Sequence, residues 1–509
     1  MGALAGALLE TSCVRKQFFQ ADARPAAALA QPLPIAADSV RGATAGRQYA
    51  RHGSFYNALI GRHHRPTWAA PVRVPVLNLA TARPGGLHPG KVGGGFNSTS
   101  LGLTNTTSRP YVIRTVDKDP IRATPEAVRG TFLVNVLRDN ISSTNPYAAL
   151  VVPPLARAAG VPHSNPRLFY VRADDPAFQT DSLRHFRGQL AYLEEKAAPP
   201  LPVGAPEPAA VVSSTKAFAA LFASPGQQID QNALLRARLL DGWLGDWDRH
   251  PGQWSWALSA PTQAGAATLT PLPKDRDMVF YRLDDGLLGW LLGHVALRHW
   301  VTFAPHYKNP SGLMSSGHYL DQRGLNGLSR AQFRTAALAM QQRLPDTLLV
   351  RALHRLPPAA FALEGPRTIA ALQARRARLP ELADGFYREL ARRPRIGGTA
   401  QPERFAIHRY ADSTVVIVES AAAGASEARL LRRAFLPSET KVIQLEGLAG
   451  DDVFTVEKHG TNAAGKPAIR IYGGAGNDEF RAANGGSRGI RFAQESAPAK
   501  RAYDKLPEE

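Results

Sequence analysis

The residues best suited to chemistry gather in two short stretches near the middle of the chain. The first reads DRHPGQ and holds Asp248 and Gln253, and the second reads DRD and holds Asp275 and Asp277. Phosphoryl transfer needs one carboxylate to orient or deprotonate the attacking hydroxyl, and further oxygen ligands to hold Mg²⁺ against the phosphates. The pattern therefore predicts Asp248 as the catalytic base, with Gln253 and Asp275 as magnesium ligands and Asp277 as the alternative acid.

A glycine-rich segment and a strand-like segment upstream would supply the phosphate-binding half of such a site. The segment KVGGGFNSTSLGL contains Gly93, Gly94 and Gly95, and the segment RPYVIRTV that follows carries Arg114. Kinase-fold enzymes place a glycine-rich turn over the phosphates and then a strand with a basic residue. We therefore expect the three glycines and Arg114 to bind nucleotide phosphates.

Four other residues are predicted to support this site rather than to react. The helix expected after the Arg114 strand offers Asp139 as the acidic partner of Arg114, with Glu126 as the less favoured alternative. Asp246 is either an acid behind the reacting groups or a helix cap, and Arg249 and His250 are expected to brace the loop. The alternative interpretation is a buried network of these acids and bases that only ties helices together.

The segment from 236 to 256 also holds four of the seven tryptophans of the chain. Large rings of this kind are usually buried, whereas carboxylates avoid burial unless they are paired. We expect the tryptophans to pack helices around the acidic loop and so to hold it rigidly.

The two acidic motifs resemble those of known kinases. DRHxxQ is similar to the DRHxxN catalytic loop of phosphoinositide kinases and their relatives, and DRD resembles the metal-binding DxD motif of CotH-like kinases. The resemblance implies an α+β, two-lobed protein-kinase-like fold with a mixed N-lobe and a helical C-lobe, followed by a small all-β domain. It also implies Mg²⁺ and ATP as cofactors.

Three features depart from the kinase pattern and leave several functions open. Arg114 replaces the strand lysine, Gln253 replaces the metal-binding asparagine, and the glycine segment lacks GxGxxG. An atypical kinase that phosphorylates an unknown acceptor and an inactive pseudokinase that serves as an envelope scaffold are both compatible with these changes. A metal-dependent hydrolase using the same acids with His250 is less attractive, because such sites usually gather several histidines.

A second resemblance covers roughly residues 45 to 480. The stretches GRHHRPTWAAPVRVPVLNL, LLDGWLGDWDRHPGQWSWA and LPKDRDMVFYRLDDGLL are similar to an uncharacterised bacterial envelope family. Its members often carry a metallophosphoesterase and an outer-membrane β-barrel. The resemblance implies a place in the periplasm or at the outer membrane, with an envelope partner, although the first residues give no convincing signal peptide.

The chain of 509 residues is too long for one hydrophobic core, so we expect several domains. Composition and periodicity predict a disordered or targeting tail over 1–45, a kinase-like N-lobe over 46–200 and a helical C-lobe with the acidic loops over 201–400. They then predict a β-sandwich or short β-solenoid over 401–486 and a disordered tail over 487–509.

Two segments of the predicted β region, GLAGDDVFT and GGAGNDEFR, resemble the calcium-binding repeat of RTX β-rolls. Their oxygen-bearing side chains, Asp451, Asp452, Asn477 and Asp478, are of the type that Ca²⁺ prefers. RTX repeats adjoin one another, whereas these two segments are well separated. Ordinary glycine–aspartate turns between strands are therefore the favoured interpretation, with calcium as the alternative.

The bulk composition excludes several classes of protein. The net charge of +19 comes mostly from scattered arginines without interleaved aromatic residues, so we do not expect nucleic acid as a partner. No apolar run approaches the roughly 18 residues of a membrane-spanning helix. The single cysteine excludes an internal disulfide framework.

Overall fold

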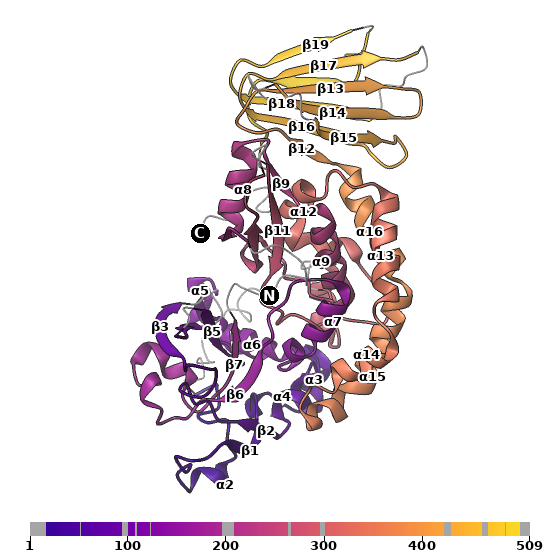
Figure 1. The fold of residues 1–509 in the computed structure, drawn as a ribbon. Coiled ribbons are helices and arrows are strands. Elements are labelled where there is room, and N and C mark those ends of the chain that lie inside the picture. Colours follow the sequence, from indigo (N-terminus) through magenta and orange to yellow (C-terminus); the bar gives the residue numbers. More distant parts are fainter. Residues whose placement is uncertain are drawn as a thin grey trace.

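The computed structural model describes residues 17–50, 52–93, 100–106, 109–122, 124–195, 208–262, 266–295, 301–421, 429–460, 467–483 and 485–498. Within these ranges the chain is mixed α+β with several separate sheets, as the sequence predicts. The first strands lie at one end of the molecule, most helices in the middle and the last strands at the other end (Figure 1). The helices are α2 (Ala26–Leu29), α3 (Ser54–Ile60), α4 (Arg65–Ala69), α5 (Glu126–Arg129), α6 (Leu133–Asp139), α7 (Val152–Ala159), α8 (Ser214–Ala223), α9 (Gln231–Leu244), α10 (Leu287–Val295), α11 (Pro310–Met314), α12 (His318–Gly324), α13 (Arg330–Gln342), α14 (Asp346–Leu353), α15 (Pro358–Ala377) and α16 (Leu379–Arg392).

The first large sheet has five antiparallel strands in the order β3–β4–β5–β7–β6. The glycine-rich segment joins β3 to β4, and β5 carries Arg114. One face is covered by a hydrophobic cluster that includes Leu101, Ile113 and Leu193. The bounds are β3 (His88–Gly93), β4 (Ser100–Thr104), β5 (Pro110–Thr115), β6 (Arg167–Tyr170) and β7 (Leu190–Glu195).

Residues 17–45, which the composition predicts to be a disordered tail, are part of the fold. Strand β1 (Ser39–Ala43) pairs with β2 (Val72–Pro75), and Ala23 and Val40 are buried. The prediction is wrong for these residues because small alanines and a few apolar residues pack closely without sustained periodicity. That kind of packing leaves no repeating pattern in the sequence.

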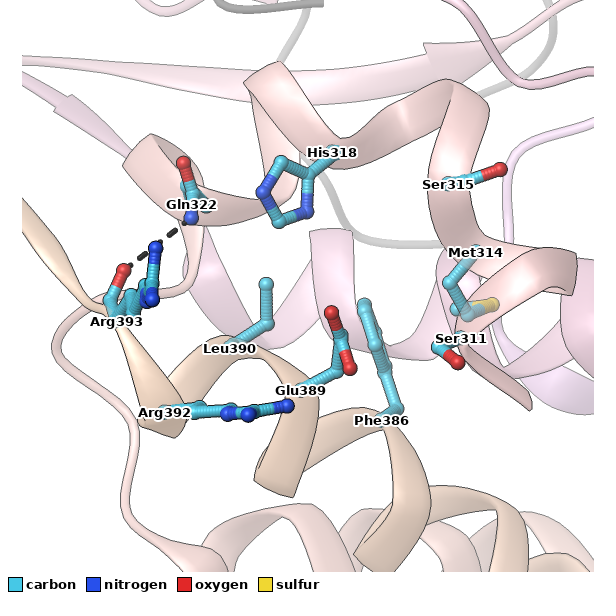
Figure 2. Close-up of a pocket in the computed structure, with 10 residues that line it drawn as sticks. All are labelled: Ser311, Met314, Ser315, His318, Gln322, Phe386, Glu389, Leu390, Arg392 and Arg393. Carbon is cyan, nitrogen blue, oxygen red and sulfur yellow. Dashed lines mark hydrogen bonds between the residues drawn. The ribbon is translucent and has the colours of Figure 1, made fainter. Parts of the chain in front are cut away.

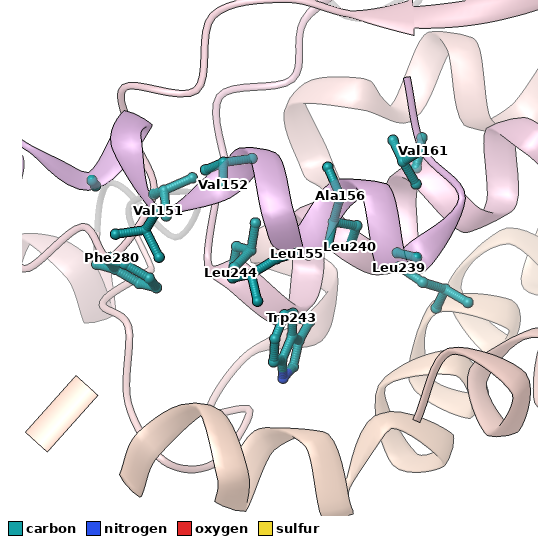
Figure 3. Packing of buried hydrophobic residues seen from close by; sticks show 14 of the residues in the cluster. Val151, Val152, Leu155, Ala156, Val161, Leu239, Leu240, Trp243, Leu244 and Phe280 are labelled. Atoms are coloured by element: carbon teal, nitrogen blue, oxygen red, sulfur yellow. The ribbon is translucent and has the colours of Figure 1, made fainter. Parts of the chain in front are cut away.

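The middle of the chain combines long helices with a four-stranded sheet in the order β8–β10–β11–β9. The predicted lobe over 201–400 is therefore less purely helical than its leucine spacing indicates. Helix α7 packs on α9, where Leu155, Leu240, Trp243 and Leu244 are buried in the main core (Figure 3). The strands are β8 (Ala210–Ser213), β9 (Gln227–Ile229), β10 (Trp254–Leu258) and β11 (Ala267–Pro273).

From Arg395 onward the named elements are strands, and they form two facing sheets around a shared core. One sheet has the parallel order β12–β16–β18–β20. The other has the order β15–β14–β13–β17–β19, in which β15, β14 and β13 pair antiparallel and β13, β17 and β19 pair parallel. The bounds are β12 (Arg395–Gly397), β13 (Glu403–Arg409), β14 (Thr414–Ser420), β15 (Arg429–Phe435), β16 (Val442–Ala449), β17 (Val453–Lys458), β18 (Ala468–Ala475), β19 (Glu479–Ala482) and β20 (Ile490–Ala493).

Two predicted boundaries of the β region shift as a result. Strand β12 lies before residue 401, in what the leucine spacing assigns to the helical lobe. Strand β20 pairs with β18 inside the predicted tail over 487–509, so the tail prediction is wrong for its first part. Both strands are short edge strands whose place is fixed by pairing with distant residues, which a local pattern does not reveal.

Candidate functional site

The hairpin of β10 and β11 brings the two acidic motifs together. DRHPGQ ends immediately before β10 and DRD begins just after β11, and the two strands pair antiparallel with Trp254 opposite Pro273. The backbone N–H of Lys274 donates to the carbonyl of Gln253 at 2.9 Å. The two motifs therefore lie at the same end of one hairpin.

The side chain of Arg249 forms hydrogen bonds with the backbone of both motifs. Its guanidinium donates to the carbonyls of Lys274 at 2.7 Å and Asp275 at 3.0 Å on the DRD side, and to the carbonyl of Gln253 at 3.2 Å. The same group is buried and stacks over the ring of Trp254, 4.7 Å from its centre. Arg249 thus braces the loop, in the supporting position that its sequence neighbours predict.

Asp275 itself has a left-handed backbone, with φ of +46°. Aspartate tolerates this conformation better than most residues. The left-handed backbone is still unfavourable, so contacts with neighbouring residues must offset its free-energy cost. The hydrogen bond from Arg249 to the carbonyl of Asp275 is part of that support. Backbone strain of this kind is found often at functional sites. Here the strained residue is the one whose carboxylate projects from the end of the hairpin.

Behind the motifs lies a buried network of charges. Asp241 contacts Arg238 at 3.0 Å, Arg249 at 3.3 Å and Arg276, and Asp246 accepts from Arg276 at 3.2 Å. Burial raises the pKa of Asp246 to about 7 against the opposing effect of Arg249 and Arg276. The Asp246 carboxylate therefore belongs to this network, and its backbone N–H donates to the carbonyl of Asp241 in the last turn of α9 at 2.9 Å, while its part in any reaction stays a prediction. The buried network of acids and bases that was the alternative interpretation is therefore present, and it lies beside the candidate site.

Two cationic side chains, one on the first large sheet and one just after it, contact the DRD motif. Arg114 Nη1 lies 2.8 Å from Asp275 Oδ2, and Arg114 Nε lies 3.6 Å from Glu194 Oε1 on the neighbouring strand β7. Lys118, just beyond β5, forms an ion pair with Asp277. Ion pairs therefore connect β5 and the residues just after it with the end of the β10–β11 hairpin, although the two are far apart in the sequence.

These charges and a small cavity define the electrostatics of the site. Burial alone would raise the pKa of Asp275, but Arg114 and Lys118 outweigh it and lower that pKa. A cavity of about 60 Å³ lies at the junction of these side chains. Its lining residues are Arg114, Thr115, Val116, Lys118, Thr144, Asn145, Pro146, Ala149, Pro166, Tyr192, Glu194, Asp275, Arg276 and Asp277.

Asp248 stands beside this cavity without lining it. Burial raises the pKa of Asp248, and the nearby carboxylates of Asp277 and Asp275 add to the rise against the lowering effect of His250. His250 Nε2 lies 4.0 Å from Asp248 Oδ1, and its Nδ1 accepts the N–H of Gly252 at 3.1 Å. His250 thus caps the short turn after Asp248, which is the bracing position predicted for it.

The predicted partner of Arg114 is wrong. Asp139 lies at the end of α6, where its oxygens accept from Arg65 at 2.5 Å, His52 at 2.9 Å and Tyr56 at 2.9 Å. Burial alone would raise the pKa of Asp139, but His52 and Arg65 lower it to about 2. The helix follows β5 in sequence but turns its terminal acid toward α3 and α4, away from Arg114.

The glycine segment is described only at its first residue. Gly93 ends β3 and pairs with Ser100 of β4, which in turn pairs with Arg114 of β5. Gly94 and Gly95 lie outside the described residues. Gly93 therefore lies in the same sheet as Arg114, two strands away, and phosphate binding by the glycines stays a prediction.

Two residues of this cluster were missed by sequence reasoning, Lys118 and Glu194. Lys118 stands in the segment TVDKDP directly after the predicted strand, so a second cation near Arg114 was visible in the sequence. Glu194 had no local signal, because its position opposite Val112 depends on the pairing of β5 with β7.

The tryptophans pack as expected. Trp243, Trp254 and Trp256 are fully buried in the main core, and Trp247 is half-buried. The indole N–H of Trp254 donates to the carbonyl of Arg249 at 3.2 Å. The rings therefore fix both the helix before the acidic loop and the strand after it.

The predicted calcium ligands lie at stacked corners of the C-terminal strands. Asp452 Oδ1 accepts the N–H of Glu403 at 2.8 Å, Asp478 Oδ1 accepts the N–H of Asp452 at 3.0 Å, and Asp451 Oδ1 accepts the N–H of Asn477 at 2.8 Å. Each aspartate thus caps the backbone of an adjacent corner, which accounts for the repeated Gly-Asp pattern as turn chemistry. Calcium binding stays a prediction.

Close packing explains the glycines of that pattern. A Cβ on Gly447 would lie 2.2 Å from Asp452 Oδ2, and a Cβ on Gly473 would lie 2.1 Å from Asp478 Oδ2. Only glycine leaves room for the aspartate to fold back onto the corner.

A larger pocket of about 340 Å³ lies elsewhere, between α11, α12 and α16 (Figure 2). The side chain of Gln322 donates to the carbonyl of Arg393 at 3.3 Å along one edge. Its lining residues are Ser311, Met314, Ser315, His318, Gln322, Phe386, Glu389, Leu390, Arg392 and Arg393, which include none of the predicted site residues.

Comparison with known proteins adds little to this geometry. No protein-family model matches the chain, and no curated protein matches it. A solved structure that it is similar to is the proinflammatory kinase CtkA of Helicobacter pylori, at 12% identity, covering 58% of this chain and 94% of that chain. The TM-score is 0.33, and at that value the likeness carries no argument about fold or activity.

Throughout the part of the chain that the structure describes, every helix is too short or too polar to cross a membrane. The predicted envelope location and envelope partner stay predictions.

Proposed function

We propose that this protein is kinase-like and binds a Mg²⁺–nucleotide between the first sheet and the end of the β10–β11 hairpin. The observation that carries the proposal is the contact of Arg114 with Asp275, at 2.8 Å. In kinase-fold sites the strand cation contacts the phosphates while the acid after a hairpin holds Mg²⁺, so the two side chains must lie close together, as Arg114 and Asp275 do. Lys118 repeats the pairing with Asp277.

The chemistry of the side chains fits the proposed ligand. Asp275 and Asp277 offer the hard oxygen ligands that Mg²⁺ prefers, and Arg114 and Lys118 offer cations for phosphate oxygens. In the present conformation the cations are paired with the acids, so ligand binding would exchange these ion pairs for contacts with phosphate and metal. Bound Mg²⁺ would supply the positive charge that these acids then lack.

The size of the cavity predicts a movement. A volume of about 60 Å³ is well below the roughly 300 Å³ at which ligand pockets begin. Nucleotide binding would therefore require β5 and the DRD segment to separate while the ion pairs open. Asp248, held near these acids, would then orient the acceptor hydroxyl or take its proton.

The proposal is tested by the melting temperature of the purified chain with and without Mg²⁺–ATP. Saturating ligand is expected to raise the melting temperature of the parent by a few degrees, because binding to the folded state alone stabilises it. Asp275→Ala should remove the shift, whereas Asp248→Asn should keep it. Asp346→Asn, at an exposed helix position, is the matched control and should behave as the parent.

The outcomes separate the alternatives. If Mg²⁺–ATP leaves the parent melting temperature unchanged, the nucleotide proposal fails. A shift that requires Asp275, with ATP turnover that requires Asp248, identifies a kinase, and the same shift without turnover identifies a pseudokinase. Hydrolysis of a phosphoester without added nucleotide would instead favour the hydrolase.

A further inference from the structure

Three side chains of types that can bind a metal ion meet on the outer face of the C-terminal sheet, far from the candidate nucleotide site. His408 of β13 lies directly opposite Glu457 of β17 in the parallel register. His459 follows Glu457 by two positions, so both point to the same face of the sheet. The N–H of His459 donates to the carbonyl of Arg409 at 2.8 Å, which continues the pairing past the end of β17.

The ligand atoms of these residues form a compact triangle. His408 Nδ1 lies 3.0 Å from His459 Nε2 and 3.4 Å from Glu457 Oε2, and His459 Nε2 lies 3.7 Å from Glu457 Oε2. Ligands about 2.0–2.1 Å from a tetrahedral zinc ion are roughly 3.3 Å apart, so the three separations bracket the expected value. A point equidistant from the three atoms lies about 2 Å from each, which matches a zinc–ligand bond.

The surroundings hold the triangle in place and leave it accessible. The ring of Tyr410 stacks on His459 with centroids 4.8 Å apart and planes 13° apart. The side chains of His408, His459 and Glu457 are 25%, 40% and 52% exposed, so an ion would reach them from solvent and would have room for a water ligand. Rings fixed in advance lose less conformational freedom when they bind.

We propose that His408, Glu457 and His459 form a three-ligand site for Zn²⁺, with water in the fourth position. Two imidazoles and one carboxylate suit zinc and its first-row neighbours, whereas Ca²⁺ and Mg²⁺ prefer oxygen ligands throughout. A bound ion would join β13 to β17 across a parallel ladder. The proposal is independent of the nucleotide site and of the aspartate corners.

The test uses the full chain, freed of any histidine tag and treated with a chelator that is then removed. Zn²⁺ titrated by calorimetry is expected to bind with a Kd of about 1 µM or tighter at one site. His408→Ala and His459→Ala should each weaken that binding at least about tenfold, and Glu457→Gln should weaken it in the same direction. His88→Ala, an exposed strand histidine outside the cluster, is the matched control.

A spectroscopic measurement checks the geometry separately from affinity. Co²⁺ in place of zinc should give the strong visible absorption of a tetrahedral ion in the parent and in His88→Ala, and lose it in His408→Ala. Absence of one-site Zn²⁺ binding by the parent would overturn the proposal. Equal weakening by His88→Ala and His408→Ala would overturn it too, because zinc would then bind scattered surface histidines.

Discussion

The guanidinium of Arg114, a residue of the first large sheet, lies 2.8 Å from the carboxylate of Asp275, which follows the sheet of β8, β10, β11 and β9. Arg114 is the last residue but one of β5, whereas Asp275 lies two positions after the end of β11. The contact therefore exists only when the first sheet and the hairpin are both folded and docked. It makes the relative position of the two sheets part of the candidate site.

The first prediction concerns the charge at position 114. Arg114→Ala should weaken Mg²⁺–ATP binding at least about tenfold, which corresponds to about 1.4 kcal/mol, because a phosphate-binding cation is lost. Arg114→Lys keeps the charge without the planar guanidinium and should bind more tightly than the alanine variant. Calorimetric titration of both variants measures the difference, and equal affinity for the parent and Arg114→Ala would contradict the role.

The second prediction separates the observed partner of Arg114 from the one expected from the sequence. Glu194→Gln should change nucleotide affinity because Glu194 helps to orient Arg114. Asp139→Asn should leave that affinity unchanged but lower the free energy of unfolding by about 3–5 kcal/mol, since Arg65 is left buried without its anion. Urea unfolding and calorimetry on both variants measure the two effects, and the opposite pattern would restore Asp139 as the partner.

The third prediction concerns the brace between the acidic motifs. Arg249→Met should lower the free energy of unfolding by about 3–5 kcal/mol, because Asp241 and Asp246 lose a buried countercharge. Arg330→Met removes an exposed ion pair with Asp384 and should cost less than about 1 kcal/mol. Chemical unfolding of the two variants gives the comparison. Similar losses would mean that the buried network contributes no more than a surface pair.

The fourth prediction concerns the pH dependence of stability. Burial raises the pKa of Asp452 to about 7, with the neighbouring acids Glu403 and Asp478 adding to the rise, from an ordinary value near 3.8. Between these values the folded chain holds a proton that the unfolded chain has released, so this group lowers stability as the pH rises from about 4 to about 7. Asp452→Asn removes that loss.

The size of this loss of stability follows from the rise in the pKa of Asp452. One pKa unit corresponds to about 1.4 kcal/mol, so the asparagine variant should gain on the order of 2–4 kcal/mol over the parent between pH 4 and pH 8. Urea unfolding across this range measures the gain. Asp412→Asn, on an exposed turn, is the control and should follow the parent. A parallel course for the parent and Asp452→Asn would show that Asp452 is ionised throughout.

Much of the candidate site was predictable because its parts are local in sequence. DRHPGQ and DRD flank β10 and β11, and an antiparallel hairpin must bring its two ends together. The placement of Asp248 near Asp275 follows from that geometry alone. The bracing positions of Arg249 and His250 and the burial of the tryptophans follow from the same few residues.

The remaining contacts had no local signal. Asp139 was the acid expected from the helix after β5, but the direction of that helix depends on its packing against α3 and α4. The short strands β1, β12 and β20 owe their place to partners far along the chain. Residues without periodicity therefore looked disordered although they are paired or buried.

The sequence by itself determined which chemical groups are present and which of them share a hairpin, since spacing along a strand or turn fixes local geometry. Tertiary structure alone decided that Arg114 and Lys118 reach Asp275 and Asp277, and that His408 faces Glu457 and His459. Those contacts depend on how separate sheets dock and how parallel strands align. Both are set by the packing of whole elements, for which short-range patterns carry no information.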